Sequence, residues 1–500
     1  MAVIKANKYN ILVAFFVALG SFTYGYNSSV TAGVVGLPSF FAYMKIDTAT
    51  SQGNALFGAI NGVYLAGGAF GCWTLAWLAD TVGRVRTIRI VTVICIVSAA
   101  IQCGSVHVGM FLAGRLVNGF GVGMINTLIP LYQSEISPPS QRGRLVGLHG
   151  AILVAGYSCG GWTSYGAYFA ANKELQWRLP LAIQLLAPLV LLVGSPWLPE
   201  SPRWLISHGR KEQGMAVLSS LHRTAEDPHA MGAHLEFREI QNQIHIEAEE
   251  HIDTLWKCLC SSDVRRRMIY GFCLQWLLQS TGVLVVFNYQ TVLYANLGVT
   301  GSTPLLLLSV YNVVAAIFNY ICSLVLDRFG RINIITFGVA GCIADLILYT
   351  ALVSEFANTT NRVGNGFAIL ALFLFAVFYG FLDSASYVYC SEIFPTSVRA
   401  HGMGFAVSGL FLSNILYTQV APTAFDTIGW KFFLVFIIVP AAGLVPFRLF
   451  YPETKLLSLE EVSYLFGGTA PEAGDEKQQV QSDRDPRVSE NEETIAVYND

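Results

Sequence analysis

The chain of 500 residues is 53% hydrophobic and only 13% charged, and its mean hydropathy is +0.51. Soluble proteins carry about 25% charged residues, so the composition excludes an ordinary soluble domain and predicts a protein that crosses a membrane many times. The net charge of −3 provides no basic field, which argues against a nucleic-acid partner.

Twelve apolar stretches follow one another in two sets of six, each with the roughly 20 residues needed to cross a bilayer core. The predicted spans are 9–29, 54–79, 87–106, 109–134, 144–170, 179–198, 268–296, 303–326, 332–354, 366–391, 401–424 and 429–450. The first stretch exceeds a signal peptide's apolar region and lacks a small-residue cleavage site, so we expect it to be retained. We therefore predict an all-α membrane protein with twelve transmembrane helices.

The charged residues gather between and beyond these spans. We expect the divisions 1–8 (amino terminus), 9–198 (first six-helix half), 199–267 (linker), 268–450 (second six-helix half) and 451–500 (tail). The linker should be helical, because residues 236–251 mix apolar and charged side chains at helical spacing. The tail beyond about residue 467 is acidic and rich in Gln, Ser and Pro, which predicts disorder.

Lys and Arg residues concentrate on the side of the membrane that holds the linker and both ends of the chain. Such a bias marks the cytoplasmic side, so we place both termini in the cytoplasm and expect the protein in the plasma membrane. Asn358, in an Asn-Thr-Thr triplet, then lies outside, where a glycan could be attached.

Motifs of enzymes are missing from the sequence. It contains no Walker-type phosphate loop or nucleophile elbow, and its ten cysteines lack the spacing of redox or zinc motifs. We therefore expect no enzymatic activity, no cofactor and no metal site.

Two charged motifs occur once in each half. D-x-x-G-R follows the second and eighth spans, and a glutamate seven residues before an arginine follows the fourth and tenth. The charged residues are Asp80, Arg84, Asp327 and Arg331 in the first motif and Glu135, Arg142, Glu392 and Arg399 in the second. Recurrence in one order indicates two related halves, as in transporters built from repeats.

These eight charges predict a cytoplasmic gate. A carboxylate at the end of one span and guanidinium groups in adjoining loops can form charge-assisted pairs across neighbouring helices. Such pairs would break when the two halves rock apart. The alternative is that the charges only fix the topology or cap helices.

The motifs together resemble the sugar porter family of the major facilitator superfamily, most closely its fungal hexose and disaccharide permease-like members. The resemblance covers roughly residues 9–466, and its further matching segments are 25–27, 114–115, 130–143, 199–204, 275–282 and 452–455. It implies a twelve-helix bundle, a central sugar site and a helical cytoplasmic domain between the halves.

The resemblance also points to sugar-binding residues. Amides can donate to and accept from sugar hydroxyls, and aromatic rings suit the apolar ring face. Gln275 and Gln279 match two binding glutamines and lie on one helix face, with Gly282 further along. The other candidates are Asn414, Phe411, Tyr387 and Asn312. For each amide the alternative is a helix–helix hydrogen bond, worth about 0.6–2 kcal/mol.

Several polar positions of the family site differ in this chain. The glutamine of span five falls on Gly150, one glutamine of span seven on Leu278, and the asparagine that follows on Leu284. In span eight the position at which the family has an asparagine is occupied by Ala315. Asn312 and Asn319 lie on the same helix face as Ala315. A different sugar, a disaccharide or a polyol therefore stays open as the substrate.

One substitution concerns proton coupling. Proton-coupled sugar porters have an aspartate in span one that works beside the arginine of span four, and this chain has Asn27 with Arg115. An amide cannot titrate, so Asn27 favours facilitated diffusion. Asp383 is the alternative proton site, because it lies in span ten four residues before Tyr387, on the same face.

The sequence thus predicts a monomeric transporter in the lipid bilayer that moves a hexose-like monosaccharide by alternating access and facilitated diffusion. A proton-coupled symporter of a disaccharide or polyol is one alternative. A transporter-like sugar sensor is another, although such proteins usually carry a longer signalling tail.

Overall fold

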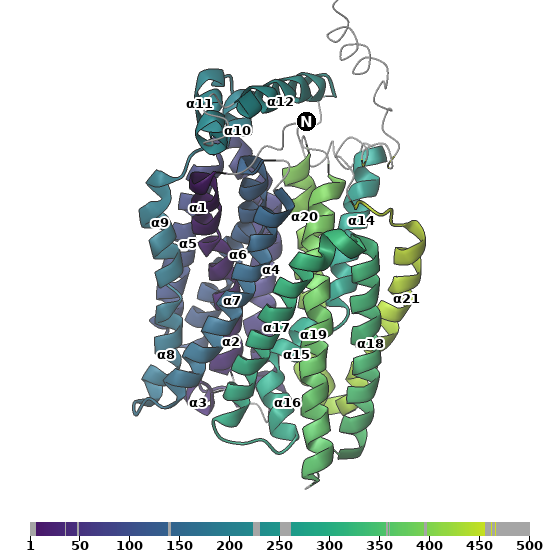
Figure 1. Cartoon of the computed structure of the whole chain (residues 1–500). Helices are drawn as coiled ribbons and strands as arrows, with labels where there is room; N and C mark the ends of the chain where they lie inside the picture. The colour runs from purple at the N-terminus through teal and green to yellow at the C-terminus, as the bar shows by residue number, and fades with distance from the viewer. Residues whose placement is uncertain are drawn as a thin grey trace, which may run out of the picture.

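The protein is a bundle of long helices in which two halves lie side by side (Figure 1). The computed structural model describes residues 7–35, 37–47, 50–138, 142–223, 231–250, 262–356, 359, 361–394, 398–455, 462 and 466. Every regular element in these ranges is a helix.

The first half runs from α1 to η2. Its elements are α1 (Lys8–Val17), α2 (Leu19–Val35), α3 (Pro38–Met44), α4 (Ser51–Val82), α5 (Arg84–Cys103), α6 (Val108–Ile136), α7 (Arg142–Tyr168), α8 (Lys173–Ile183), α9 (Leu186–Gly194) and η2 (Ser195–Trp197). The first span is therefore formed by α1 with α2, and the sixth by α8 with α9.

The second half runs from α14 to α21. Its elements are α14 (Ser262–Gln279), α15 (Val283–Asn288), α16 (Gln290–Asn296), α17 (Thr303–Phe329), α18 (Arg331–Phe356), α19 (Arg362–Ile393), α20 (Arg399–Ile428), η3 (Gly429–Leu434) and α21 (Val435–Phe450).

Nine segments of the described chain are long and apolar enough to cross a membrane, and the last, of 52 residues, contains both α20 and α21. In addition, α7 and the run from α14 to α16 extend along the bundle beside them (Figure 1). The order of helices in the described chain thus matches the twelve predicted spans.

The seventh span differs from the prediction of one helix over 268–296, because it is broken after Gln279. Gly282 has φ of +79°, a left-handed conformation that only glycine adopts at low cost. A Cβ at Gly282 would lie 2.6 Å from Cγ of Phe436, so the space beside it is also filled. The break makes Gln279 the last residue of α14.

Small residues allow the two halves to approach closely. Helix α4 packs against α20, and α7 packs against α17. A Cβ at Gly161 would lie 3.2 Å from Cα of Ser309, and one at Gly404 would lie 2.6 Å from the carbonyl oxygen of Cys72. Such close backbone contacts are typical of helix packing in membranes.

The segment between the halves contains α10 (Pro202–Ser207), α11 (Lys211–His222) and α12 (Met231–Glu250), which lie at one end of the bundle (Figure 1). His222 Nε2 lies 3.0 Å from Glu236 Oε2 and joins α11 to α12. Asn7, just before α1, donates through Nδ2 to the carbonyl oxygens of Ser220 at 2.7 Å and Arg223 at 3.1 Å. The start of the described chain and the linker therefore lie at the same end.

Candidate functional site

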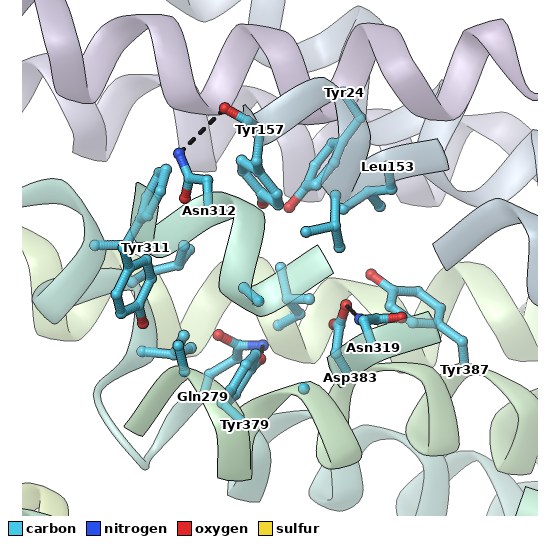
Figure 2. Close-up of a pocket in the computed structure, with 18 residues that line it drawn as sticks. Tyr24, Leu153, Tyr157, Gln279, Tyr311, Asn312, Asn319, Tyr379, Asp383 and Tyr387 are labelled. Atoms are coloured by element: carbon cyan, nitrogen blue, oxygen red, sulfur yellow. Dashed lines mark hydrogen bonds between the residues drawn. The ribbon is translucent and has the colours of Figure 1, made fainter. Parts of the chain in front are cut away.

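A cavity lies between the two halves (Figure 2). Helices α2 and α7 of the first half and α14, α15, α17, α19 and α20 of the second contribute to its wall. The lining residues with polar groups or aromatic rings are Tyr24, Tyr157, Gln279, Phe287, Tyr311, Asn312, Asn319, Tyr379, Asp383 and Tyr387.

Gln279 is held by partners on two other helices. Its Nε2 donates to the hydroxyl of Tyr379 on α19 at 3.0 Å, and its Oε1 accepts from Nδ2 of Asn414 on α20 at 3.1 Å. Asn414 Nδ2 also donates to the carbonyl oxygen of Leu410 at 2.7 Å. These bonds orient the Gln279 amide and leave it one N–H and one oxygen lone pair for a ligand.

Helix α17 presents Asn312 and Asn319 to the cavity, on one face as their spacing predicts. Asn312 Nδ2 donates to the Tyr157 carbonyl oxygen at 3.1 Å, a bond visible in Figure 2, and to the Ser29 hydroxyl at 3.3 Å. Both acceptors belong to the first half, so this amide links the two halves.

Asp383 is the one acidic side chain in the wall formed by the described residues. Its Oδ2 accepts a hydrogen bond from Asn319 Nδ2 at 3.0 Å, and Asn319 Oδ1 accepts one from the Ser384 hydroxyl at 2.5 Å. The serine thereby fixes which end of the Asn319 amide faces the carboxylate.

Aromatic rings form much of the remaining wall. The Tyr157 ring lies edge to face with those of Phe287, at 5.1 Å between centroids, and Tyr24, at 6.3 Å. The Tyr387 hydroxyl accepts from Asn126 Nδ2 of α6 at 3.0 Å, a third hydrogen bond between the halves. Ring faces of this kind can cover the apolar face of a sugar.

The predicted coupling residues of the first half lie apart from the cavity wall. Asn27 is 2% exposed, and its Nδ2 donates to the Thr23 carbonyl oxygen of its own helix at 2.7 Å. The Arg115 guanidinium lies 4.0 Å from the centroid of the Tyr64 ring and donates through Nε to the Ile60 carbonyl oxygen at 3.4 Å. Among the described residues Arg115 has no acidic partner.

The gate charges of the first half form one cluster at the linker end of the bundle. Arg84 pairs through Nη2 with Glu135 Oε1 at 2.9 Å and through Nη1 with Asp80 Oδ1 at 2.8 Å. Glu200 accepts from the backbone N–H groups of Arg84 at 2.8 Å and Val85 at 3.2 Å, the first two of α5. A carboxylate there satisfies unpaired donors and complements the helix dipole. Burial raises the pKa of Glu200 above its usual range, although the backbone donors act in the opposite direction.

The second half repeats this geometry. Arg331 pairs through Nη2 with Glu392 Oε1 at 2.7 Å, and Glu453 accepts from the backbone N–H groups of Arg331 at 2.8 Å and Ile332 at 3.0 Å. The Thr454 hydroxyl donates to Glu392 Oε2 at 2.6 Å. In both halves the gate arginine therefore follows a glycine turn and joins the ends of three chain segments.

Comparisons with known proteins assign the family. The model of a family described as sugar (and other) transporter matches residues 13–466. MFS-type transporter criB of Aspergillus cristatus is 31% identical over 450 residues, which are 90% of this chain and 91% of the relative. The chain belongs to the sugar porter family of the major facilitator superfamily. Hexose transporter HXT13 of Saccharomyces cerevisiae is 29% identical over 471 residues, covering 91% of this chain and 82% of the relative.

A solved structure supports the fold of this sugar porter. The proton:xylose symporter XylE, bound to 6-bromo-6-deoxy-D-glucose, superimposes with a TM-score of 0.79 at 22% identity, over 92% of this chain and 99% of that one. The predicted all-α major facilitator fold is thereby confirmed. The protein is a multi-pass membrane transporter, and its family is not one of enzymes.

Some of the predicted binding residues line the cavity, and others lie behind its wall. Those in the wall are Gln279, Asn312 and Tyr387, and the coupling candidate Asp383 lines it too. Gln275 is buried and donates through Nε2 to Cys390 Sγ at 3.8 Å, and Phe411 packs on Gly68 of α4. Asn414 also lies outside the wall, where it orients Gln279.

Apart from Tyr387, the tyrosines of the wall are not among the residues predicted from the sequence. For Tyr379 a signal was present, because it precedes Asp383 by four residues on α19, as Asp383 precedes Tyr387. Tyr24 and Tyr157 gave no such signal, since each lies on a separate helix and meets the others only in the folded bundle.

The structure also qualifies the predicted gate. The Arg84–Glu135 and Arg331–Glu392 pairs each join helices of one half, so rigid rocking of the halves would not break them. Arg399 donates through Nε to the Phe394 carbonyl oxygen at 3.4 Å. The side chains of Arg142 and Asp327, and the glycosylation candidate Asn358, lie outside the described residues.

Proposed function

We propose that this sugar porter carries a hexose-like carbohydrate across the plasma membrane by alternating access, as a monomer with both termini in the cytoplasm. The observation that supports this proposal is the cavity between the halves, with amides and tyrosine rings in its wall. Substrate binding there would contact both halves at once, which is the arrangement that alternating access requires.

Gln279 and Asn312 are the proposed hydroxyl-binding residues. Gln279 keeps one donor and one acceptor free, so it can match a sugar hydroxyl in either role. Both N–H groups of Asn312 are used by Tyr157 and Ser29, so Asn312 offers its Oδ1 as an acceptor. Their protein partners hold them in place before the substrate arrives, which reduces the entropy lost on binding. The rings of Tyr24, Tyr157 and Tyr387 would cover the apolar faces of the sugar.

Alternating access also needs contacts that can break. The Asn126–Tyr387 and Asn312–Tyr157 hydrogen bonds join the halves through neutral groups, each worth about 0.5–1.5 kcal/mol net. In contrast, the charged Arg84–Glu135 and Arg331–Glu392 pairs hold each half together. We infer that each half moves as a rigid body and that the neutral bonds between the halves exchange.

Facilitated diffusion is the proposed mode of transport. Asn27 bonds to its own helix, and the nearby Arg115 faces a tyrosine ring rather than a carboxylate. Of these two residues, the amide does not titrate and the guanidinium stays protonated near neutral pH. Proton symport through Asp383 is the second candidate, because that carboxylate lines the cavity.

Uptake into proteoliposomes tests the proposal. The purified full chain is reconstituted, and uptake of labelled glucose, xylose, lactose and a polyol is measured with and without a protonophore. We expect at least one of these compounds to equilibrate to the external concentration, with no effect of the protonophore. Accumulation above that level, abolished by the protonophore and by Asp383→Asn, would establish symport instead. Binding without uptake of any of these compounds would indicate a sensor.

A further inference from the structure

The cavity holds a negative charge that facilitated transport of a neutral sugar does not use. Asp383 lies across the cavity from Tyr24 and Tyr157 (Figure 2), and no Lys, Arg or His belongs to the wall formed by the described residues. A carboxylate in the middle of a membrane is costly unless a cation or a proton compensates it.

The hydrogen bonds around Asp383 favour its ionised form. Asn319 Oδ1 is occupied by the Ser384 hydroxyl, so the Asn319 amide presents N–H to Asp383 Oδ2. A donor of this kind stabilises a carboxylate more than a carboxylic acid, because the charged oxygen is the stronger acceptor. Asp383 Oδ1 has no hydrogen-bond partner among the described residues and is not a buried atom, so it stays available to a ligand.

Aromatic rings surround this carboxylate. Tyr379 and Tyr387 lie one turn before and after Asp383 on α19, and Tyr24 and Tyr157 lie across the cavity from it in the first half. Ring faces attract cations, most strongly where water is excluded. A carboxylate within a group of tyrosines is therefore a suitable environment for an ammonium group.

Parts of the same wall offer no hydrogen-bonding side chain to a sugar hydroxyl. Leu284 and Leu153 line the cavity, and Gly150 provides no side chain beside Asn319 and Ser384. A charge-assisted hydrogen bond is about twice as strong as a neutral one, so one ammonium group can replace the hydroxyl contacts that these residues do not make.

We propose that the preferred substrate is a carbohydrate that carries a protonated amine, and that Asp383 binds its ammonium group. This inference rests on the proposed function, since it names the substrate class of the same cavity. The carboxylate also disfavours sugar acids, because no cation in the described wall would compensate their charge.

Proteoliposomes with an imposed membrane potential test the inference. Uptake of labelled glucosamine, glucose and gluconate is compared for the unmodified chain, Asp383→Asn, Asp383→Glu and the control Asp345→Asn. Asp345 is a buried carboxylate of α18 that does not line the cavity. We expect an inside-negative potential to increase glucosamine uptake several-fold and to leave glucose uptake unchanged, because only the ammonium sugar brings charge.

The variants test whether the preference for glucosamine depends on the carboxylate of Asp383. Asp383→Asn should weaken glucosamine binding about tenfold or more and by a larger factor than it weakens glucose binding, whereas Asp383→Glu and Asp345→Asn should keep the preference for glucosamine. Thermal stabilisation of the detergent-purified variants by each sugar measures binding without transport, so loss of uptake alone is not mistaken for loss of affinity.

Three results would overturn the inference. Glucose taken up in preference to glucosamine, or equal losses for both in Asp383→Asn, would remove the ammonium contact and leave the proposed function intact. If the membrane potential drives uptake of neutral glucose and this effect requires Asp383, then Asp383 carries a coupling proton and does not bind an ammonium group. Absence of binding and uptake for every carbohydrate would refute the proposed function, and the inference with it.

Discussion

The substitution Gln279→Ala tests the amide at the centre of the cavity. The side chain already gives one N–H to Tyr379 and one oxygen lone pair to Asn414, so one donor and one acceptor are left for the substrate. Two neutral hydrogen bonds are worth about 1–3 kcal/mol together. Affinity for the transported sugar should therefore fall about 5- to 150-fold.

The assay is a titration of uptake into proteoliposomes against sugar concentration, with Gln275→Ala as the matched control. Gln275 lies one turn earlier on α14, is buried and does not line the cavity. The control should keep the affinity of the unmodified chain. Unchanged affinity in Gln279→Ala, or an equal loss in both variants, would refute the role of Gln279 as a contact residue.

Two further predictions concern stability and turnover. Gly282→Ala should lower stability by about 1–3 kcal/mol and more than Gly298→Ala, because both glycines have φ of +79° but only Gly282 faces a side chain, the Phe436 ring. Thermal unfolding of the purified variants measures this, and equal losses would contradict the account. Arg84→Ala leaves Glu135, 6% exposed, without its partner, which costs about 3–5 kcal/mol. It should slow transport and keep sugar affinity within a few-fold, so normal transport with badly weakened affinity would contradict the gate assignment.

The sequence predicts the order of the helices well because hydropathy and repeated motifs are local signals. Most of the predicted spans agree with helices of the structure to within a few residues, as 303–326 does with α17. The break in the seventh span was missed, since a glycine within an apolar stretch does not reveal its φ angle. Gly282 takes a left-handed conformation through packing against Phe436, and that contact forms only in the folded protein.

The candidate site was predicted less completely. Spacing along one helix identified Asn312 and Asn319 on α17 and Asp383 with Tyr387 on α19. Residues that meet across helices carry no such signal, which explains why Tyr157 was missed and why Gln275, on the same helix as Gln279, was expected in the wall. Residue spacing predicts which side chains share one face of a helix, but it does not predict how far along that face the cavity extends.

Glu200 and Glu453, which follow Pro199 and Pro452, make contacts that the sequence does not predict. In the sequence they are only matches to the family, whereas in the structure each binds the first turn of the helix after a gate glycine. Because Glu200 and α5 are far apart in sequence, only the folded chain reveals this contact.

Access to residue 279 from each side of the membrane tests alternating access most directly. Gln279→Cys is prepared in a cysteine-free chain and exposed to a membrane-impermeant thiol reagent in oriented vesicles, with Leu324→Cys, on the outer surface of α17 and 65% exposed, as the lipid-facing control. We predict labelling at 279 from either side, protection by the transported sugar, and no labelling at 324. Labelling at 279 from neither side, or from one side only without protection by any sugar, would contradict the account.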